Sequence, residues 1–304
     1  MQKPGKLTLV DDGADTIDVP GKESHIVIIA WCYNLMKMSL MYDEFLSEIS
    51  SDFIDVGGMR TAYYFYNGNS DKTILLIHGI GGDFHGMIPL AYRLRNDANL
   101  LFVDLPSHGK SQLISNMEVS DIEYWARNLL PTFKQRGLRI NEIVAHSLGC
   151  LAASKTGCPK IWYINPPFET PIVTKISSSF LYHVRWINQH IYLNYYFSVF
   201  RGMCLIRNRQ KSTISLIKWL ARKTRVASRQ YLEQAKIARD VSRREKMTIP
   251  EGKFTGLIVG RFDKITRPTG ANGVKINKFV ELNTGHLSVL DSPELISKLI
   301  LSEE

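Results

Sequence analysis

The stretch Glu142-Ile-Val-Ala-His-Ser-Leu-Gly-Cys-Leu-Ala-Ala-Ser154 runs from a short apolar segment through a turn into helix-forming residues. Ser147 lies at the turn, between the small residues Ala145 and Gly149. A sharp turn from a strand into a helix lifts a serine hydroxyl clear of the backbone if small residues flank it on both sides. The stretch therefore predicts a strand, a helix from about Leu151 and a nucleophilic Ser147. The alternative is a serine that only caps the helix.

Further apolar runs of the same kind occur on both sides of this stretch, and each is followed by turn residues and then a longer helical pattern. Such an alternation is typical of buried parallel strands joined by crossover helices. Residues 52–66 precede them and form two strand patterns around Gly57-Gly58, which predicts a hairpin. We expect an α/β fold with a mostly parallel central sheet, flanked by helices and ending in an antiparallel edge. The runs are 74–78, 100–104, 161–164 and 256–260.

The strand pattern stops after Asn165-Pro166-Pro167, and the following residues are helical, aromatic and basic. Strands resume at Phe254. This interval is too long for a plain loop, so we expect a helical lid inserted between two strands of the sheet. The expected organisation is an N-terminal extension over residues 1–50, a core made of residues 51–167 and 249–304, and a lid over residues 168–248.

A carboxylate and a histidine follow two later strand patterns. Asp263 comes just past the run at 256–260, and His286 ends the turn Leu282-Asn-Thr-Gly-His286. Serine, aspartate and histidine thus occur in the chain order of one known type of catalytic triad. In such a triad the histidine takes the serine proton, and the aspartate holds the imidazole in the useful tautomer. The alternatives are that Asp263 only caps a turn and that His286 is a surface histidine. Glu169 is the alternative acid of the triad.

The loop His78-Gly-Ile-Gly-Gly82 follows the first of the parallel strand patterns. A glycine-rich loop at this place can direct a backbone N–H at a developing negative charge, which makes Ile80 a candidate for the oxyanion hole. The second donor is expected to be the N–H of Leu148, the residue after the nucleophile. A phosphate-binding loop is the competing interpretation, but no Gly-Lys-Ser/Thr follows.

From about Asp52 to the C-terminus, the sequence resembles α/β-hydrolase fold enzymes of the esterase, lipase and C–C hydrolase branch. The segment Asp104-Leu-Pro-Ser-His-Gly-Lys-Ser111 resembles that family's D-x-P-G-x-G-x-S pattern, with Ser107 in place of glycine. Gly285-His286 followed by Ser292-Pro293-Glu294 resembles its common ending. A serine nucleophile speaks against epoxide hydrolases, haloalkane dehalogenases and dienelactone hydrolases, whereas cofactor-free haloperoxidases share the serine, histidine and aspartate.

The termini and the cysteines bear on localisation. The four cysteines are scattered, which favours a reducing compartment, and no secretory signal opens the chain, so a cytoplasmic protein is expected. Residues 26–41 are largely apolar but shorter than a usual membrane span. We expect an accessory helix packed against the domain or lying along a membrane surface, with a true membrane anchor as the alternative.

Basic residues concentrate in one part of the chain. The net charge is +9, yet residues 151–250 hold 18 Lys and Arg against four acids. Within this part, residues 211–225 place Ile214, Ile217, Leu220 and Ala221 on one helical face, which suits an anionic membrane surface or amphiphile; a solvated face is the alternative. No nucleic-acid partner is expected, because no base-reading motif accompanies the basic residues.

Aromatic residues crowd the front of the expected lid, where they could line an apolar pocket or form the lid's own core. Together these features favour a serine hydrolase that needs no cofactor or metal and cleaves a carboxylic ester or thioester, with a hydrophobic acyl or lipid ester as substrate. The alternatives are a small-molecule receptor on the same scaffold, a C–C hydrolase or a cofactor-free haloperoxidase. The aromatic residues are Phe168, Phe180, Tyr182, Trp186, Tyr192, Tyr195, Tyr196, Phe197 and Phe200.

Overall fold

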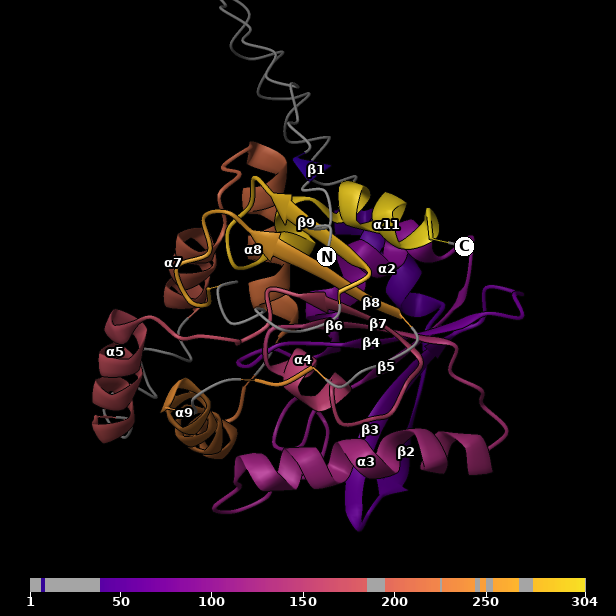
Figure 1. Ribbon diagram of the computed structural model, residues 1–304, viewed down its shortest axis with the longest axis horizontal. Coiled ribbons are helices and arrows are strands. Elements are labelled where there is room, and N and C mark those ends of the chain that lie inside the picture. The colour runs from indigo at the N-terminus through magenta and orange to yellow at the C-terminus, as the bar shows by residue number, and fades with distance from the viewer. Residues whose placement is uncertain are drawn as a thin grey trace, which may run out of the picture.

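The computed structural model describes residues 7–8, 39–184, 195–224, 226–243, 247–249, 254–267 and 276–303. Within this part of the chain the strands form one sheet, in the order β1-β9-β8-β7-β6-β4-β5-β3-β2 (Figure 1). The strands are β1 (Leu7–Thr8), β2 (Ser50–Val56), β3 (Met59–Tyr66), β4 (Thr73–Ile77), β5 (Asn99–Val103), β6 (Glu142–His146), β7 (Lys160–Ile164), β8 (Phe254–Gly260) and β9 (Lys278–Leu282).

The sheet is parallel from β1 to β5 and antiparallel at the edge formed by β3 and β2. The central strands β4 and β6 are buried along their whole length, because helices cover both faces of the sheet. At the edge, Gly57 and Gly58 turn the hairpin with φ of +62° and +82°, values that glycine adopts without steric cost. The mostly parallel sheet with an antiparallel edge is therefore confirmed.

Two layers of helices enclose the sheet, each above its own cluster of buried side chains. Helices α2 and α11 and the helical residues 39–47 cover one face, and α3 and α4 cover the other (Figure 1). The helices are η1 (Phe84–Met87), α2 (Ile88–Leu94), α3 (Val119–Gln135), α4 (Leu148–Ala153), α5 (Ile172–His183), α7 (Tyr195–Leu205), α8 (Lys211–Lys223), α9 (Ser228–Arg243), α10 (Ser288–Asp291) and α11 (Pro293–Leu301).

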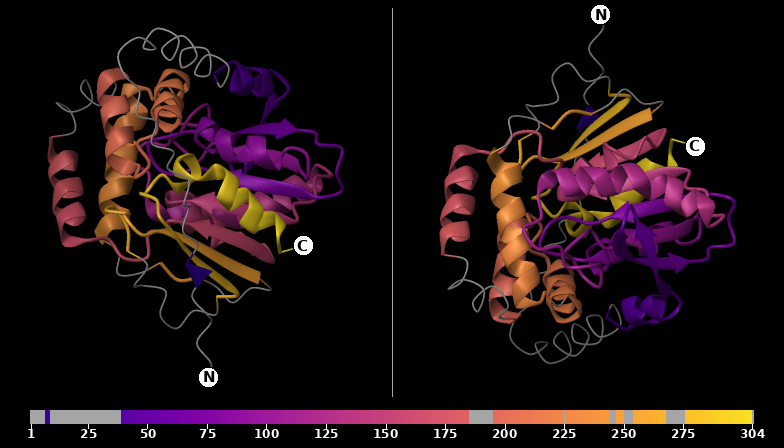
Figure 2. Two further views of the ribbon diagram at one scale, coloured as in Figure 1. Left: turned by 90° about the horizontal axis from the view of Figure 1, so that it is seen from above. Right: turned by 90° about the horizontal axis from the view of Figure 1, so that it is seen from below.

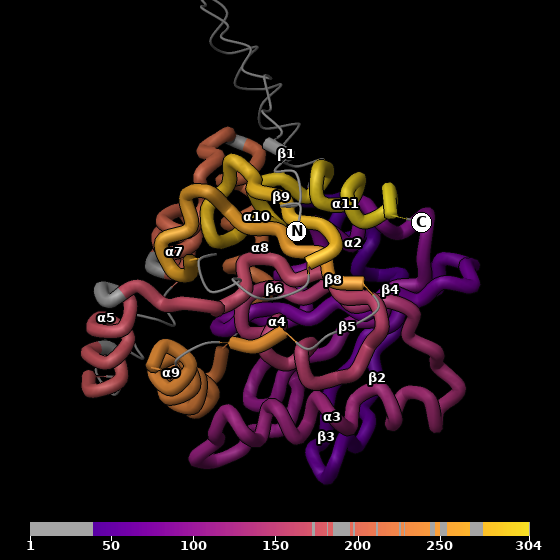
Figure 3. Tube along the Cα trace, viewed as in Figure 1, coloured from indigo at the N-terminus to yellow at the C-terminus, as the bar shows by residue number. Residues whose placement is uncertain are grey.

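Helices α5, α7, α8 and α9 come between β7 and β8 in the chain, and they gather at one end of the sheet in every view (Figures 1 and 2). Helix α5 packs against α9, and α7 packs against α8. Figure 3 shows the same arrangement as a tube, with α5 beside α9. We call residues 172–243 the helical segment.

Helix α8 packs against the helical residues 39–47. The ring of Trp219 lies 5.4 Å from that of Tyr42, measured between centroids, and its indole N–H donates to Asp43 Oδ1 at 3.0 Å. Trp219 is only 3% exposed. This contact fixes which face of α8 points inward.

Most of the apolar segment predicted at residues 26–41 lies outside the described residues, which begin again at residue 39. The helix that the structure describes next covers residues 39–47. Within the described residues, none of the helices combines the length and the apolar character needed to cross a membrane.

Candidate active site

Ser147 occupies a strained backbone turn between β6 and α4. Its φ of +52° and ψ of −117° lie in a region that residues with a side chain rarely adopt. A Cβ atom on Gly149 would lie 2.6 Å from the carbonyl oxygens of both Ile77 and His78, so only glycine lets α4 begin this close to β4. The strain of Ser147 and the close approach at Gly149 together produce a turn of the kind that presents a nucleophile.

The structure brings Ser147, His286 and Asp263 into one line of hydrogen bonds. His286 Nε2 lies 3.0 Å from Ser147 Oγ, and His286 Nδ1 lies 2.8 Å from Asp263 Oδ2. Each residue follows a parallel strand, and the carboxyl ends of parallel strands meet at the same edge of the sheet. Ser147 and His286 are each 6% exposed. The three residues that are far apart in the sequence thus form one buried group.

Asp263 is held as a carboxylate by an array of donors. Its Oδ2 accepts from His286, from Asn165 Nδ2 at 2.8 Å and from Thr266 Oγ1 at 2.7 Å. Its Oδ1 accepts from the N–H groups of Ile265 and Thr266, at 2.7 and 3.0 Å. Burial by itself would raise the pKa of Asp263, but His286 and these hydrogen bonds hold it well below its usual range. An ionised Asp263 keeps the proton of neutral His286 on Nδ1, which leaves Nε2 to accept from Ser147.

Two residues that sequence reasoning missed fix the orientation of this group. Asn165 follows β7 with φ of +49°, and its side-chain amide also donates to Gly285 O at 3.3 Å. His146 ends β6, and its Nε2–H donates to His286 O at 2.9 Å. Burial, followed by the electrostatic effect of the neighbouring His286 ring, lowers the pKa of His146 to about 3, so the His146 ring is neutral. The only signal in the sequence is that both polar residues stand at the end of a buried strand.

The two acids considered for the triad differ in what they contact. The carboxylate bonded to His286 is that of Asp263. Glu169 instead pairs through its backbone with Arg267, whose N–H donates to Glu169 O at 2.9 Å. The arrangement therefore favours Asp263 as the orienting acid.

The glycine-rich loop after β4 packs directly on the turn that carries Ser147. A Cβ atom on Gly79 would lie 2.9 Å from His146 Nδ1 and 3.0 Å from Ser147 Cβ. Ile80 lines the same cavity as Ser147. Leu148 is the first residue of α4, so its N–H has no carbonyl partner within that helix. Both segments that were predicted to supply oxyanion donors therefore border Ser147.

The segment after β5 that resembles the family pattern, residues 104–111, stabilises a turn through the side chain of Asp104. Asp104 accepts hydrogen bonds from Phe84 N at 3.0 Å, Lys110 N at 2.8 Å and the Tyr64 hydroxyl at 2.7 Å. A Cβ atom on Gly109 would lie 2.1 Å from its Oδ2, which explains the glycine there. Ser107, which stands where the family pattern has glycine, adopts φ of +60°. Asp104 thus ties this turn to η1, beside the cavity.

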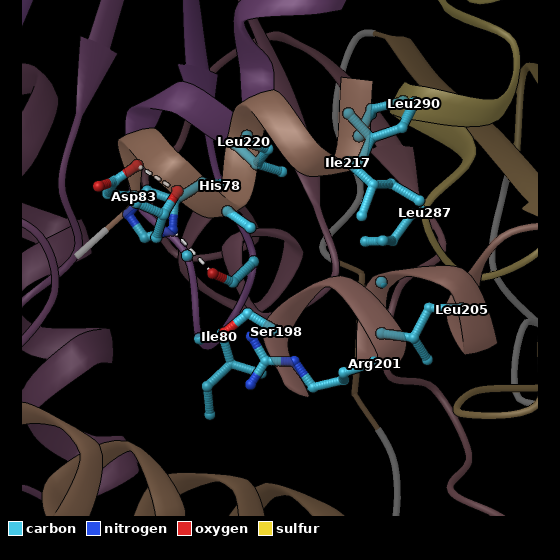
Figure 4. A pocket seen from close by; sticks show the side chains of 18 of the residues that line it. His78, Ile80, Asp83, Ser198, Arg201, Leu205, Ile217, Leu220, Leu287 and Leu290 are labelled. Atoms are coloured by element: carbon cyan, nitrogen blue, oxygen red, sulfur yellow. Dashed lines mark hydrogen bonds between the residues drawn. The ribbon is translucent and has the colours of Figure 1, made fainter. Parts of the chain in front are cut away.

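A cavity of about 760 Å³ is lined by Ser147 and His286. Figure 4 shows part of its lining, with residues of the glycine-rich loop and of two helices of the helical segment labelled. The glycine-rich loop forms one side, and α7 and α8 of the helical segment form another. Ile217, Leu220 and Ala221, which the sequence places on one apolar face of a helix, line this cavity. The apolar face of α8 therefore points into the molecule. The aliphatic lining comprises Ile80, Met87, Leu205, Ile217, Leu220, Ala221, Val226, Ile265, Leu287, Val289 and Leu290.

The aromatic residues of the helical segment contribute little to this cavity. Of those that the structure describes, Tyr195 lines it, whereas Phe168 is buried in the core of the sheet. Phe180, Tyr196 and Phe200 are 64%, 79% and 62% exposed. Trp186, Tyr192 and the side chain of Phe197 lie outside the described part of the chain. Apart from Tyr195, α7 and α8 place Leu205, Ile217 and Leu220 in the described wall rather than aromatic rings.

Several solved structures share this fold at low sequence identity. An esterase from Thermogutta terrifontis is 17% identical with a TM-score of 0.62, over 83% of this chain and 97% of that one. A putative lipase from Acinetobacter baumannii AYE is 18% identical with a TM-score of 0.61, over 95% and 97%. A bacterial membrane phospholipase A described as a virulence factor is 17% identical with a TM-score of 0.66, over 92% and 93%.

The sequence itself also matches a curated protein over part of its length and a family profile over most of it. The dihydrolipoyllysine-residue acetyltransferase component of the acetoin cleaving system from Cupriavidus necator is 29% identical over 97 residues. These residues are 32% of this chain, and they span only 25% of that protein. Residues 74–299 match the profile of the family described as Alpha/beta hydrolase family. Because this match runs over most of the chain, the protein belongs to the alpha/beta hydrolase family.

Proposed function

We propose that the protein is a serine hydrolase that cleaves a carboxylic ester or thioester through an acyl intermediate on Ser147. The observation that carries the proposal is the line of hydrogen bonds from Ser147 through His286 to Asp263, at the wall of an apolar cavity. The likeness in fold to an esterase and to a putative lipase supports the same reaction class.

The first half of the reaction forms the acyl enzyme. His286 Nε2 takes the proton from Ser147 Oγ while Oγ attacks the carbonyl carbon of the substrate. The ionised Asp263 stabilises the imidazolium that results. The carbonyl oxygen becomes negative and accepts hydrogen bonds from the N–H groups of Ile80 and Leu148. The bond to the leaving group then breaks, and His286 gives its proton to the departing oxygen or sulfur.

The second half releases the acid. A water molecule takes the place of the leaving group, and His286 Nε2 removes one of its protons as its oxygen attacks the acyl carbon. The same N–H groups bind the second oxyanion. When the bond to Ser147 Oγ breaks, His286 returns the proton to that oxygen. The sum is one ester and one water converted to one acid and one alcohol or thiol, with the enzyme unchanged.

Labelling with a fluorophosphonate probe tests this proposal, because such probes react with an activated serine. The wild-type protein is expected to be labelled at Ser147, and Ser147→Ala is expected not to be labelled. Absence of labelling in the wild type, or equal labelling of the variant, would contradict the proposal. A receptor on the same scaffold could be labelled as well, but it would not hydrolyse p-nitrophenyl acyl esters over many turnovers.

A series of p-nitrophenyl esters with acyl chains of increasing length tests the substrate class. Each methylene buried on the aliphatic wall contributes about 0.8 kcal/mol, so kcat/KM is expected to rise about fourfold per added methylene until the cavity is full. A flat or falling series would argue against a hydrophobic acyl substrate.

Asp291 is a positioning residue that joins the histidine loop to the end of α7. It is 5% exposed and accepts hydrogen bonds from Gly285 N at 2.7 Å, Arg207 N at 2.9 Å and Asn208 N at 3.2 Å. Asp291→Asn keeps the shape but removes the charge and one acceptor oxygen. Since hydrogen bonds to a charged group contribute about 1.5 to 3 kcal/mol, we expect misplacement of His286 and a loss of about tenfold in kcat.

Steady-state kinetics on a p-nitrophenyl ester measures this effect, and a kcat loss without a matching change in KM is the sign of a positioning role. The control is Glu294→Gln, which removes an acid whose side chain is 52% exposed in the neighbouring helix. If Asp291→Asn and Glu294→Gln have the same kcat as the wild type, Asp291 does not position the histidine.

A further inference from the structure

Two arginines line the largely aliphatic cavity, one from each helix that covers it. Arg201 belongs to α7 and is half-buried, and Arg222 belongs to α8 and is exposed. In Figure 4 the side chain of Arg201 extends toward Ile80, next to Ser198, whereas Leu287 and Leu290 lie at the opposite side of the view. The cavity thus has a cationic side close to the expected oxyanion hole and an aliphatic side away from it.

Among the described lining residues the carboxylate is that of Asp83, and it already accepts hydrogen bonds from residues of the protein. Asp83 is 6% exposed, and its Oδ1 accepts from His85 N at 3.0 Å, His85 Nδ1 at 2.9 Å and Thr224 Oγ1 at 3.3 Å. Its charge is therefore directed at His85 and Thr224. With two arginines and one carboxylate, the described lining residues carry a net positive charge.

Two other cations of the helical segment, which do not line the cavity, form ion pairs with acids. Lys223 Nζ lies 2.8 Å from Asp43 Oδ1, and Arg239 Nη2 lies 2.7 Å from Asp240 Oδ1. Arg201 differs in its place, because it lies in the wall of the cavity that contains Ser147. The excess of basic over acidic residues in 151–250 also favours the approach of anions to this part of the chain.

We infer that the substrate is an amphiphilic ester with an anionic group, a carboxylate or a phosphate, which Arg201 binds while an aliphatic chain packs against Leu205, Leu287 and Leu290. This inference rests on the proposed hydrolase function. A guanidinium presents paired N–H donors that match a carboxylate or phosphate, and the apolar walls strengthen such charge-assisted bonds by excluding water. Arg201 is then a residue that determines specificity.

Matched pairs of esters test the inference, each pair differing at one substituent that is anionic in one member and neutral in the other. One pair bears the charge on the alcohol, 4-(hexanoyloxy)benzoate and its neutral methyl ester, with 4-(hexanoyloxy)phenyl phosphate as the phosphate form. The other pair bears it on the acyl group, the mono-p-nitrophenyl ester of adipic acid and p-nitrophenyl hexanoate. The wild type is expected to prefer the anionic member of at least one pair, and that pair identifies which half of the substrate carries the charge.

Arg201→Gln is expected to lower kcat/KM for the preferred anionic ester by about 10-fold to 100-fold, mainly through KM, as loss of a hydrogen bond to a charged group predicts. The neutral member is expected to change by less than about threefold, the range of an ordinary surface substitution. Arg201→Lys should restore part of the preference, because it keeps the charge but loses the paired donors. Arg239→Gln removes an arginine outside the cavity and should leave the preference intact.

Equal turnover of the anionic and neutral members by the wild type would overturn the inference, as would an equal loss for both in Arg201→Gln. Failure of the proposed function has a different outcome, in which the wild type hydrolyses no ester faster than Ser147→Ala. Calorimetry with the uncleavable amide 4-(hexanoylamino)benzoate and its methyl ester then still tests Arg201. Tighter binding of the anion that Arg201→Gln abolishes would support the anionic site, and equal binding of both amides would refute it.

Discussion

Ser147→Ala is expected to lower kcat for a p-nitrophenyl acyl ester by about 10,000-fold or more, because the oxygen that attacks the carbonyl carbon is lost. The fold should remain intact. The hydrogen bond of Ser147 Oγ is to His286, and alanine meets the same backbone strain as serine at φ of +52°. Thermal unfolding of wild type and variant, measured beside the kinetics, separates loss of chemistry from loss of structure.

The double variant Ser147→Ala/His286→Ala provides the sharper test. Residues that act as one unit show strongly non-additive effects, so the double variant should be no slower than either single variant. If its loss equals the product of the two single losses, the two side chains act independently and the triad is wrong. Ser177→Ala and His183→Ala, at exposed positions of α5, are the matched controls and should retain wild-type kcat.

Asp263→Asn is expected to lower kcat by about 10,000-fold through the tautomer of His286. The N–H groups of Ile265 and Thr266 would hold the amide oxygen of the new side chain in the place of Oδ1. The amide nitrogen then takes the place of Oδ2 and donates to His286 Nδ1. The imidazole proton moves to Nε2, which can no longer accept the proton of Ser147.

Glu169→Gln is the control for this variant, because Glu169 was the other candidate acid. It should retain activity within about threefold of the wild type, as is usual for a substitution away from the reacting groups. If Glu169→Gln loses as much activity as Asp263→Asn, the assignment of the acid is wrong.

Folding stability gives a second measurement on Asp263→Asn. The native pKa of Asp263 lies below the value of about 3.9 for an unfolded chain, so its stabilising contribution is fully present above that value. The contribution is lost as the pH falls through the native pKa. The difference in the free energy of unfolding between wild type and variant should therefore be constant above about pH 5 and shrink below about pH 4. Urea titrations across this range measure it.

The positions of Ser147 and Asp263 could be predicted because each follows a strand with a clear apolar pattern, and that of His286 because it ends a glycine turn after a further strand. Strands β6, β8 and β9 lie in a parallel sheet, so the residues at their carboxyl ends meet at one edge whatever their separation in the chain. The glycine at 149 was a local signal as well, since a Cβ atom there would collide with the carbonyl oxygens of β4.

The supporting residues gave no comparable signal. Asn165 and Asp263 are 98 positions apart, and His146 reaches the carbonyl of a residue 140 positions away. Asp291 binds backbone N–H groups at 207 and 208. Such hydrogen bonds depend on which loops come together in the fold. Hydrophobic periodicity and turn residues predict only local structure, so they do not predict these contacts.

The sequence by itself determined the mostly parallel sheet, the turn at Ser147 and the order of the candidate triad, because burial patterns and backbone sterics act over a few neighbouring residues. Only the tertiary structure decided what surrounds Ser147. The ring of Trp219 packs on Tyr42, and this contact turns Ile217 and Leu220 inward. The rings of Tyr196 and Phe200 are exposed, so the described wall of the cavity is largely aliphatic. The placement of Arg201 in that wall follows from the same packing, since the direction of a side chain on a helix is set by the elements against which the helix rests.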